Sequence, residues 1–259
     1  MRRCTALVTG ASTGLGAELA AQLAAEGVDL VLVARDGARL ERLAERLRAE
    51  HDSRIEVLVA DLTDRDGLER VAARLVERGS PVDILVNNAG FGVYEGFESS
   101  DIADERRMHE LLSWVPLRLA HAAVPGMLER GGGWILNVAS VAAFTPSGTY
   151  GAAKAAAVSL SRSLGARYRR SGVRVTALCP GLLDTEFHAR MGEDHLPRLP
   201  RIAWADTSRV ASEGLRALRR GRAVVVSDRR YRLLRPLIAL LPDRLLERAT
   251  TTGEPRRDR

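Results

Sequence analysis

The sequence is poor in cysteine, in aromatic residues and in long apolar runs. Neither the number nor the spacing of its two cysteines, Cys4 and Cys179, suits a disulfide framework or a metal site. Only 4% of the residues are aromatic. No basic cluster with interleaved aromatics occurs, so nucleic-acid binding is not expected despite a net charge of +6. No apolar run approaches the roughly 20 residues that cross a bilayer.

The amino-terminal segment MRRCTALVTG enters an apolar strand at once. Its apolar run is too short for a signal peptide. We therefore expect a cytoplasmic protein that binds no metal ion and whose two thiols are free and buried. Its arginines alternate with Glu and Asp along helix faces, as in RLERLAERLRAEH, which is typical of a solvated surface.

Lysine is almost absent, because Lys154 is the only one among 39 lysine and arginine residues. It lies four residues after Tyr150 in the segment GTYGAAKAAAVSL. On a helix this spacing places both side chains on one face. A nearby ammonium lowers the pKa of a phenol from about 10 toward neutrality, so that it can exchange a proton with a substrate oxygen. A compact ammonium could also reach the hydroxyls of a nicotinamide ribose, so Lys154, like Tyr150, is expected to contact the cofactor. A guanidinium is bulkier and planar and is a poor substitute in that role, which explains why arginine does not stand here.

Apolar segments rich in β-branched residues alternate with segments of helical periodicity. This pattern predicts an α/β fold, a single doubly wound Rossmann-type domain with a parallel sheet of about seven strands, within residues 1–250. The expected strands are residues 4–9, 29–34, 54–60, 82–88, 133–140, 173–180 and 222–227. Ser140 ends the fifth strand, where its hydroxyl could stabilise a developing oxyanion; taken alone, it is equally a cap or turn residue.

A glycine-rich turn, TGASTGLG, follows the first strand and opens a helix. Glycines let the backbone approach a diphosphate, and the helix N-terminus supplies N–H groups. The spacing is not the usual G-x-G-x-x-G, and a tight turn with close helix packing is the alternative. The residues expected to bind the cofactor here are Gly10, Ser12, Thr13, Gly14, Leu15 and Gly16.

The end of the second strand distinguishes NAD from NADP. In LVLVARDG, Arg35 follows the strand directly and could pair with a 2′-phosphate. Asp36 complicates this assignment, since a carboxylate could accept hydrogen bonds from the ribose. A surface charge is the alternative for Arg35. We predict NADP(H).

Together these motifs resemble the short-chain dehydrogenase/reductase family, over nearly the whole chain from TGASTGLG through VADLT, NNAG, NVAS and YGAAK to PGLLDT. The resemblance implies catalytic roles for Ser140, Tyr150 and Lys154. It also implies that Asp61 and Leu62 border the adenine of the cofactor and that Asn88, Ala89 and Gly90 support the cofactor. Thr185, which follows Pro180 and Gly181, would hold the nicotinamide amide.

Two features depart from the family's pattern. Alignment places Leu112 where the family usually has an asparagine that helps to hold a proton-relaying water, and Ser113 should face about 100° away on a helix. Ser140 and Tyr150 are ten residues apart, about three fewer than is common in the family, so either the pocket is open or the serine is displaced. These departures motivate an alternative function, a non-catalytic NADP(H)-binding sensor or scaffold.

The carboxyl-terminal third suggests further elements. Residues 182–204 should fold over the nicotinamide as an apolar lid, with His188 and His195 as lid or surface residues. Residues 228–249 form either a helix packed on protein, which we expect, or a basic amphipathic helix on a membrane. Residues 251–259 should be a disordered tail. The small-residue face of the helix after Tyr150 suits a homodimer or homotetramer; its members are Ala153, Ala156, Ala157 and Leu160.

The sequence therefore predicts an NADPH-dependent reductase of a small apolar ketone or aldehyde. Tyr150 would donate the proton and Ser140 would hold the carbonyl oxygen. An oxidative dehydrogenase of a steroid or another alcohol would use the same residues in the opposite direction.

Overall fold

A computed structural model of the chain describes residues 3–93, 95–183 and 204–227. Within them the chain forms a seven-stranded sheet in which every strand is parallel to its neighbours, in the order β3-β2-β1-β4-β5-β6-β7. The predicted single doubly wound domain is confirmed, with slightly shorter strands. They are β1 (Thr5–Thr9), β2 (Asp29–Ala34), β3 (Ile55–Val59), β4 (Ile84–Asn87), β5 (Gly133–Val138), β6 (Val173–Cys179) and β7 (Val224–Val226).

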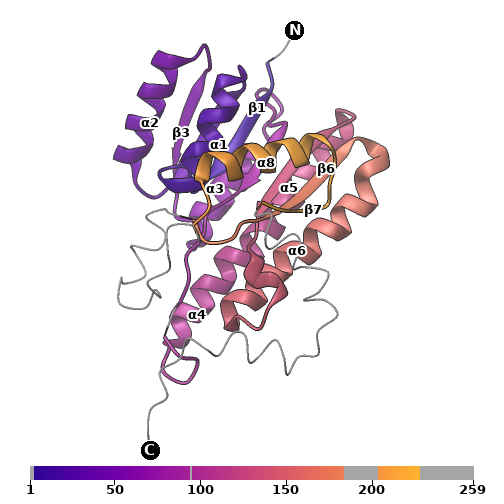
Figure 1. Cartoon of the computed structure of the whole chain (residues 1–259). Coiled ribbons are helices and arrows are strands. Elements are labelled where there is room, and N and C mark those ends of the chain that lie inside the picture. Colours follow the sequence, from indigo (N-terminus) through magenta and orange to yellow (C-terminus); the bar gives the residue numbers. More distant parts are fainter. Residues whose placement is uncertain (1–2, 94, 184–203, 228–259) are drawn as a thin grey trace, which may run out of the picture.

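Helices cover both faces of the sheet (Figure 1). On one face lie α1 (Gly14–Ala25), α2 (Gly37–Glu50) and α8 (Thr207–Arg219). On the other lie α3 (Arg65–Val76), α5 (Val115–Glu129) and α6 (Gly148–Tyr168). Because central strands are buried on both sides, they are apolar at nearly every position, as in ALV of β1 and ILV of β4.

The sheet order changes direction between β1 and β4. The chain moves from β1 outward to β2 and β3, then returns to β4 on the other side of β1. In open parallel sheets, ligands bind outside the carboxyl ends of the strands at such a switch point. Thr9, Asn87 and Val138 end their strands at this edge, so the segments that follow them meet there.

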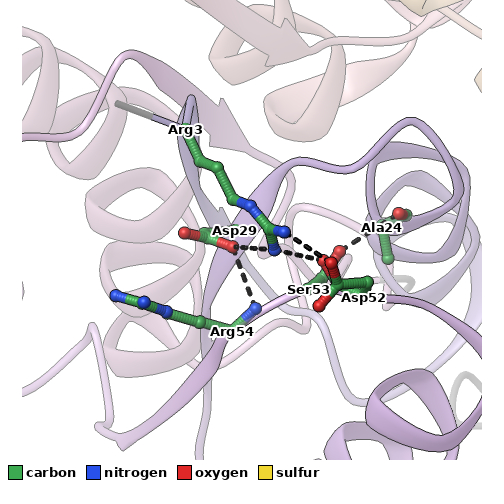
Figure 2. Close-up of polar contacts among 6 residues, drawn as sticks. All are labelled: Arg3, Ala24, Asp29, Asp52, Ser53 and Arg54. Atoms are coloured by element: carbon green, nitrogen blue, oxygen red, sulfur yellow. Dashed lines mark hydrogen bonds and ion pairs between the residues drawn. The ribbon is translucent and has the colours of Figure 1, made fainter. Parts of the chain in front are cut away.

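Charged residues are linked to one another at the amino ends of the strands, opposite the carboxyl ends just described (Figure 2). The guanidinium of Arg3 donates hydrogen bonds to the carbonyl and the carboxylate of Asp52 and lies 3.9 Å from the carboxylate of Asp29. Asp29 in turn accepts a 2.9 Å bond from the backbone N–H of Arg54, and Ser53 donates to a carbonyl at the end of α1. These contacts tie together the amino ends of β1, β2 and β3.

One helical stretch runs without a break from Ile102 to Glu129. It comprises α4 (Ile102–His109), a π-helical turn η1 (Glu110–Trp114) and α5. In the described part of the chain it is the one helix whose length and composition would allow a membrane span, and 56% of its most apolar window is buried. Such a run was not expected from the sequence. Its α5 portion packs on the sheet through buried residues such as Leu119 and Met127 and is therefore a core helix, whereas Ile102, Trp114 and Leu117 are exposed.

The small-residue face of α6 differs from the prediction. Ala153 and Ala157 are 1% and 3% exposed, because they pack inside the domain. Of the other two predicted residues, Ala156 is exposed and Leu160 is half-buried, and Ala152 and Ser159 lie with Ala156 on the exposed strip of this helix. A partner subunit could therefore contact these residues but not Ala153 or Ala157.

Candidate active site

The glycine-rich turn is packed so closely that side chains do not fit. Gly10 has φ +63, and a Cβ there would lie 2.8 Å from the Cα of Ala89. A Cβ on Gly16 would lie 2.2 Å from the carbonyl oxygen of Gly10. Thr13 caps α1 without a side-chain hydrogen bond, so no side chain caps the N–H groups of the first turn. The turn therefore has the form that holds a diphosphate at a helix N-terminus.

Asn88 holds this turn against β4. Its Nδ2 donates to the carbonyls of Thr9 and Gly10, at 3.0 and 3.1 Å. The buried hydroxyl of Thr9 accepts hydrogen bonds from the backbone N–H groups of Asn88 and Ala89 and donates to Val86. Sequence reasoning missed Thr9, although a threonine that ends a buried strand before the glycine-rich turn was a usable signal.

The segments after β2 and β3 meet through one ion pair. The guanidinium of Arg35 is 69% exposed and lies 3.7 Å from the carboxylate of Asp61. Burial opposes ionisation of Asp61, but hydrogen bonds from Thr63 and the charge of Arg35 outweigh it and lower the pKa of this carboxyl. Asp36 caps α2, accepting a 2.9 Å bond from the N–H of Arg39. Its carboxylate is thus engaged by its own helix.

Leu62 and Leu15 were predicted to contact the cofactor, but their side chains lie in the core. Each side chain is 6% exposed and packs into the core, on opposite faces of the sheet. Only their backbones can therefore face a ligand. A Cβ on Gly67 would lie 2.0 Å from the carbonyl of Asp61, so α3 packs directly against that turn. Gly67 was not predicted.

The structure brings together the three residues with expected catalytic roles. Tyr150 lies in the first turn of α6, and the Nζ of Lys154 is 5.7 Å from the centre of its ring. Lys154 is 5% exposed and donates a 2.8 Å bond to the carbonyl of Val138. Ser140 follows β5, and its hydroxyl bonds with Tyr150 and accepts from the N–H of Ala142.

The pKa values of this pair differ from the expectation. Burial raises the pKa of Tyr150 to about 12, and the hydrogen bond with Ser140 only partly opposes it. Burial also lowers the pKa of Lys154 to about 8, with the nearby Cys179 acting in the opposite direction. The expected shift of the phenol toward neutrality was wrong for the protein alone, because burial raises the pKa of Tyr150 more than the hydrogen bond with Ser140 lowers it. Tyr150 is therefore protonated at neutral pH, as a proton donor must be.

The π-helical turn changes the surroundings of Leu112 and Ser113. Leu112 is 2% exposed and packs with Met108 and Ala153 beside Tyr150. Ser113 was expected to face about 100° away from Leu112, but its hydroxyl also reaches α6, where it donates a 3.3 Å bond to the carbonyl of Ala153. The wider turn presents both residues to α6. It precedes Pro116, which lacks the N–H that an α-helix would direct at the carbonyl of Leu112.

The short loop between Ser140 and Tyr150 packs closely on the elements around it. It begins with a 3₁₀ turn, η2 (Val141–Phe144), whose first N–H bonds to the carbonyl of Pro180 at 3.0 Å. A Cβ on Gly151 would lie 3.0 Å from the carbonyl of Ala142, so the loop rests on α6. Despite the short loop, the hydroxyl of Ser140 bonds with Tyr150.

A pocket of about 400 Å³ opens beside Tyr150. Its lining residues include the apolar Val93, Phe97 and Ala152 and the acidic Glu95 and Glu105. Glu105 was not predicted as a site residue. Its signal was its place on the apolar stripe of its helix, three residues before Met108 and seven before Leu112.

Several predictions lie outside the described residues. These are Thr185, most of the lid with His188 and His195, the helix expected over 228–249 and the tail over 251–259. The two ends of the lid segment are joined, because Ala205 donates a 2.8 Å bond to the carbonyl of Leu182 and forms a bridge with Leu183.

Known proteins share this sequence pattern and fold. Residues 4–196 match the family model of the short chain dehydrogenases. The 1-deoxy-11-beta-hydroxypentalenate dehydrogenase of Streptomyces exfoliatus is 36% identical over 219 residues, which cover 82% of this chain and 77% of that protein.

Two solved structures extend over nearly the whole chain. A bulky-bulky ketone specific alcohol dehydrogenase from Comamonas testosteroni is 31% identical, with a TM-score of 0.78, covering 100% of this chain and 98% of that one. A short-chain dehydrogenase from Sphingobium yanoikuyae in complex with NADPH is 32% identical, with a TM-score of 0.82, covering 99% and 98%. The family match spans most of the chain and the fold agrees with it, so this protein is an oxidoreductase that belongs to the short-chain dehydrogenase family.

Proposed function

We propose that this oxidoreductase is an NADPH-dependent reductase of ketones or aldehydes with an apolar body, and interconverts them with the corresponding alcohols. The observation that carries the proposal is that Tyr150 lines a pocket and is in contact with Ser140 and the buried Lys154. A protonated phenol hydrogen-bonded to a serine beside a buried cation suits proton transfer to a carbonyl oxygen.

The strand edge fits a nicotinamide dinucleotide. The close-packed glycine turn at the N-terminus of α1 would hold its diphosphate, and Asp61 and the backbone of Leu62 would border its adenine. Ala89, Gly90, Pro180, Gly181 and Thr185 would line the rest. Gly90 supports this assignment, because a Cβ there would lie 2.8 Å from Leu112 and 3.7 Å from the Nζ of Lys154.

NADP rather than NAD is favoured by the residues after β2. Arg35 exposes its guanidinium at the place where a 2′-phosphate would lie, and Asp36 is occupied as a helix cap. Arg39, one turn into α2, adds a second cation near this position. A relative of known structure was solved as an NADPH complex, which agrees with this choice.

When bound, NADPH supplies the hydride that reduces the substrate carbonyl. Tyr150 donates its proton to the carbonyl oxygen, and the hydroxyl of Ser140 holds that oxygen in place. Lys154 contributes a positive charge at the base of the site, which stabilises the phenolate left after proton transfer. Reversal of these steps would oxidise an alcohol.

The pocket supports a substrate with an apolar body. Val93, Phe97 and Ala152 form much of its wall. A related enzyme of known structure is described as specific for bulky ketones. The alternative of a non-catalytic NADP(H)-binding sensor or scaffold gains no support, because Ser140 keeps its contact with Tyr150 despite the short loop.

We propose further that the protein is a cytoplasmic homodimer or homotetramer. Trp114 and Leu117 on the stretch from η1 to α5 are 53% and 41% exposed. Together with the exposed alanines of α6 they offer an apolar surface for a second subunit. Light scattering coupled to size-exclusion chromatography would show a monomer if this assignment is wrong.

The function is tested by NADPH consumption with a panel of apolar ketones and aldehydes. The Tyr150→Phe variant removes the proton donor and preserves the ring, and Tyr168→Phe, on the far end of α6, serves as the control. Turnover lost in the first variant and kept in the second supports the proposal. Turnover that survives in Tyr150→Phe would overturn it.

A further inference from the structure

Glu105 is a buried carboxylate that the proposed chemistry does not use. Its neighbours Arg106 and Arg107 lie on the surface and pair with Glu110 and Asp104. Glu105 itself is only 6% exposed. Its Oε2 is enclosed and has no hydrogen-bond partner. Such an oxygen is unfavourable in a folded protein unless a donor reaches it, so its presence requires an explanation.

The position of Glu105 suggests what that donor is. Glu105 and Tyr150 line the same pocket, whose volume of about 400 Å³ suits a small organic molecule. A single ligand in this pocket can therefore contact both Tyr150 and Glu105. Glu95 also lines the pocket, and it has a further interaction of its own. The described lining residues include no Lys or Arg.

We propose that Glu105 is a specificity-determining residue that selects carbonyl substrates carrying a hydrogen-bond donor, a hydroxyl or an ammonium, away from the carbonyl. The donor bonds to the Glu105 carboxylate while the carbonyl oxygen faces Tyr150. Substrates with a carboxylate at that end are rejected, because they would meet the like charge of Glu105. This inference rests on the proposed reductase function.

The test compares four ketones of equal chain length with the complete enzyme and NADPH. One is a plain methyl n-alkyl ketone, and the others end in a hydroxyl, an ammonium or a carboxylate. Glu105→Gln keeps the shape and removes the charge. Glu110→Gln, on the neighbouring turn and outside the pocket lining, is the matched control.

In the wild type, we expect the hydroxyl or ammonium ketone to have at least about a tenfold higher kcat/KM than the plain ketone, as for other sites built to bond a donor. Glu105→Gln should reduce the ratio for the ammonium ketone about tenfold, because it removes the charge and keeps an acceptor oxygen. Glu105→Leu, which removes the acceptor as well, should reduce the ratio for the hydroxyl ketone about tenfold. An unchanged ratio, or an equal fall for every ketone, would overturn the proposal.

Binding separates this inference from the proposed function. Calorimetric titration of the same ketones into the Tyr150→Phe variant with NADPH requires no turnover. The reductase assignment fails if the wild-type enzyme reduces none of the ketones. The role of Glu105 still stands in that case if Tyr150→Phe binds the donor-bearing ketones more tightly than the plain ketone and the added Glu105→Gln or Glu105→Leu change removes this difference. Equal binding of plain and donor-bearing ketones refutes the role of Glu105.

Discussion

The Nζ of Lys154 donates a 2.8 Å hydrogen bond to the carbonyl oxygen of Val138. Val138 is the last residue of β5, and Ser140 lies two residues beyond it. One bond thus fixes the buried ammonium to the strand that carries the serine, while Tyr150, one helical turn before the lysine, reaches the same serine. The three side chains are held by a single strand end and a single helix.

Lys154→Arg should abolish most turnover even though it preserves the charge. A guanidinium is planar and larger than an ammonium, and Lys154 is only 5% exposed, so little room is left for the larger group. We expect a fall in kcat of about a hundredfold, in the range of lost acid–base contributions. Steady-state kinetics on the best ketone measures it, with Arg167→Lys at the surface of the same helix as control. A fully active variant would show that charge alone suffices.

Removing Lys154 should stabilise the protein below pH 8. The pKa of Lys154 falls from 10.5 to about 8 on folding, so the unfolded chain binds more protons between these values and stability rises with pH across that window. Lys154→Met should therefore unfold with a free energy about 3 kcal/mol higher than wild type at pH 7. This gap should close by about pH 10.5. Urea unfolding at both pH values measures it, and a pH-independent gap would contradict the assigned shift.

Arg35→Asp should shift cofactor preference toward NADH. The change removes the exposed cation opposite Asp61 and places a carboxylate beside the expected 2′-phosphate. We expect the NADPH-to-NADH ratio of kcat/KM to fall about a hundredfold, the effect of replacing attraction by repulsion at a phosphate. Arg42→Asp, on the exposed face of α2, is the control. Unchanged selectivity would refute the assignment of Arg35.

Leu112→Asn should raise turnover and lower stability. An asparagine side chain can hold a water near Lys154, which Leu112 cannot, but it replaces a buried apolar side chain at a cost of about 2 to 4 kcal/mol. Leu111→Asn is the matched control, because Leu111 packs in a different cluster and should lose only stability. Lower turnover in Leu112→Asn at full folding would show that protons leave the site by another route.

Local sequence patterns predicted the sheet, the helices and the position of the site. All seven strands and the helix carrying Tyr150 and Lys154 follow from apolar runs and helical spacing, because burial on two faces leaves a clear signature. The direction of the Tyr150 pKa shift did not follow. It depends on how Met108, Leu112 and Ala153 enclose the ring, and this packing comes from a π-helical turn that spacing does not reveal.

Two inward-facing positions on the helices did not follow from residue type. Glu105 was not predicted as a site residue, although it is buried and lines the pocket. Ala153 and Ala157 have the small side chains of a subunit contact but pack inside the domain. In both cases the packing of the helix against neighbouring elements determines which side faces inward, and residue type alone does not show it.

The most direct test of the central claim follows the hydride itself. NADPH deuterated at the transferable nicotinamide position is incubated with a ketone that the enzyme consumes, and the product alcohol is analysed by mass spectrometry and NMR. We predict that deuterium lies on the carbinol carbon with the wild type and that Tyr150→Phe forms no labelled alcohol. NADPH that is bound but transfers no deuterium to any carbonyl compound would contradict the account.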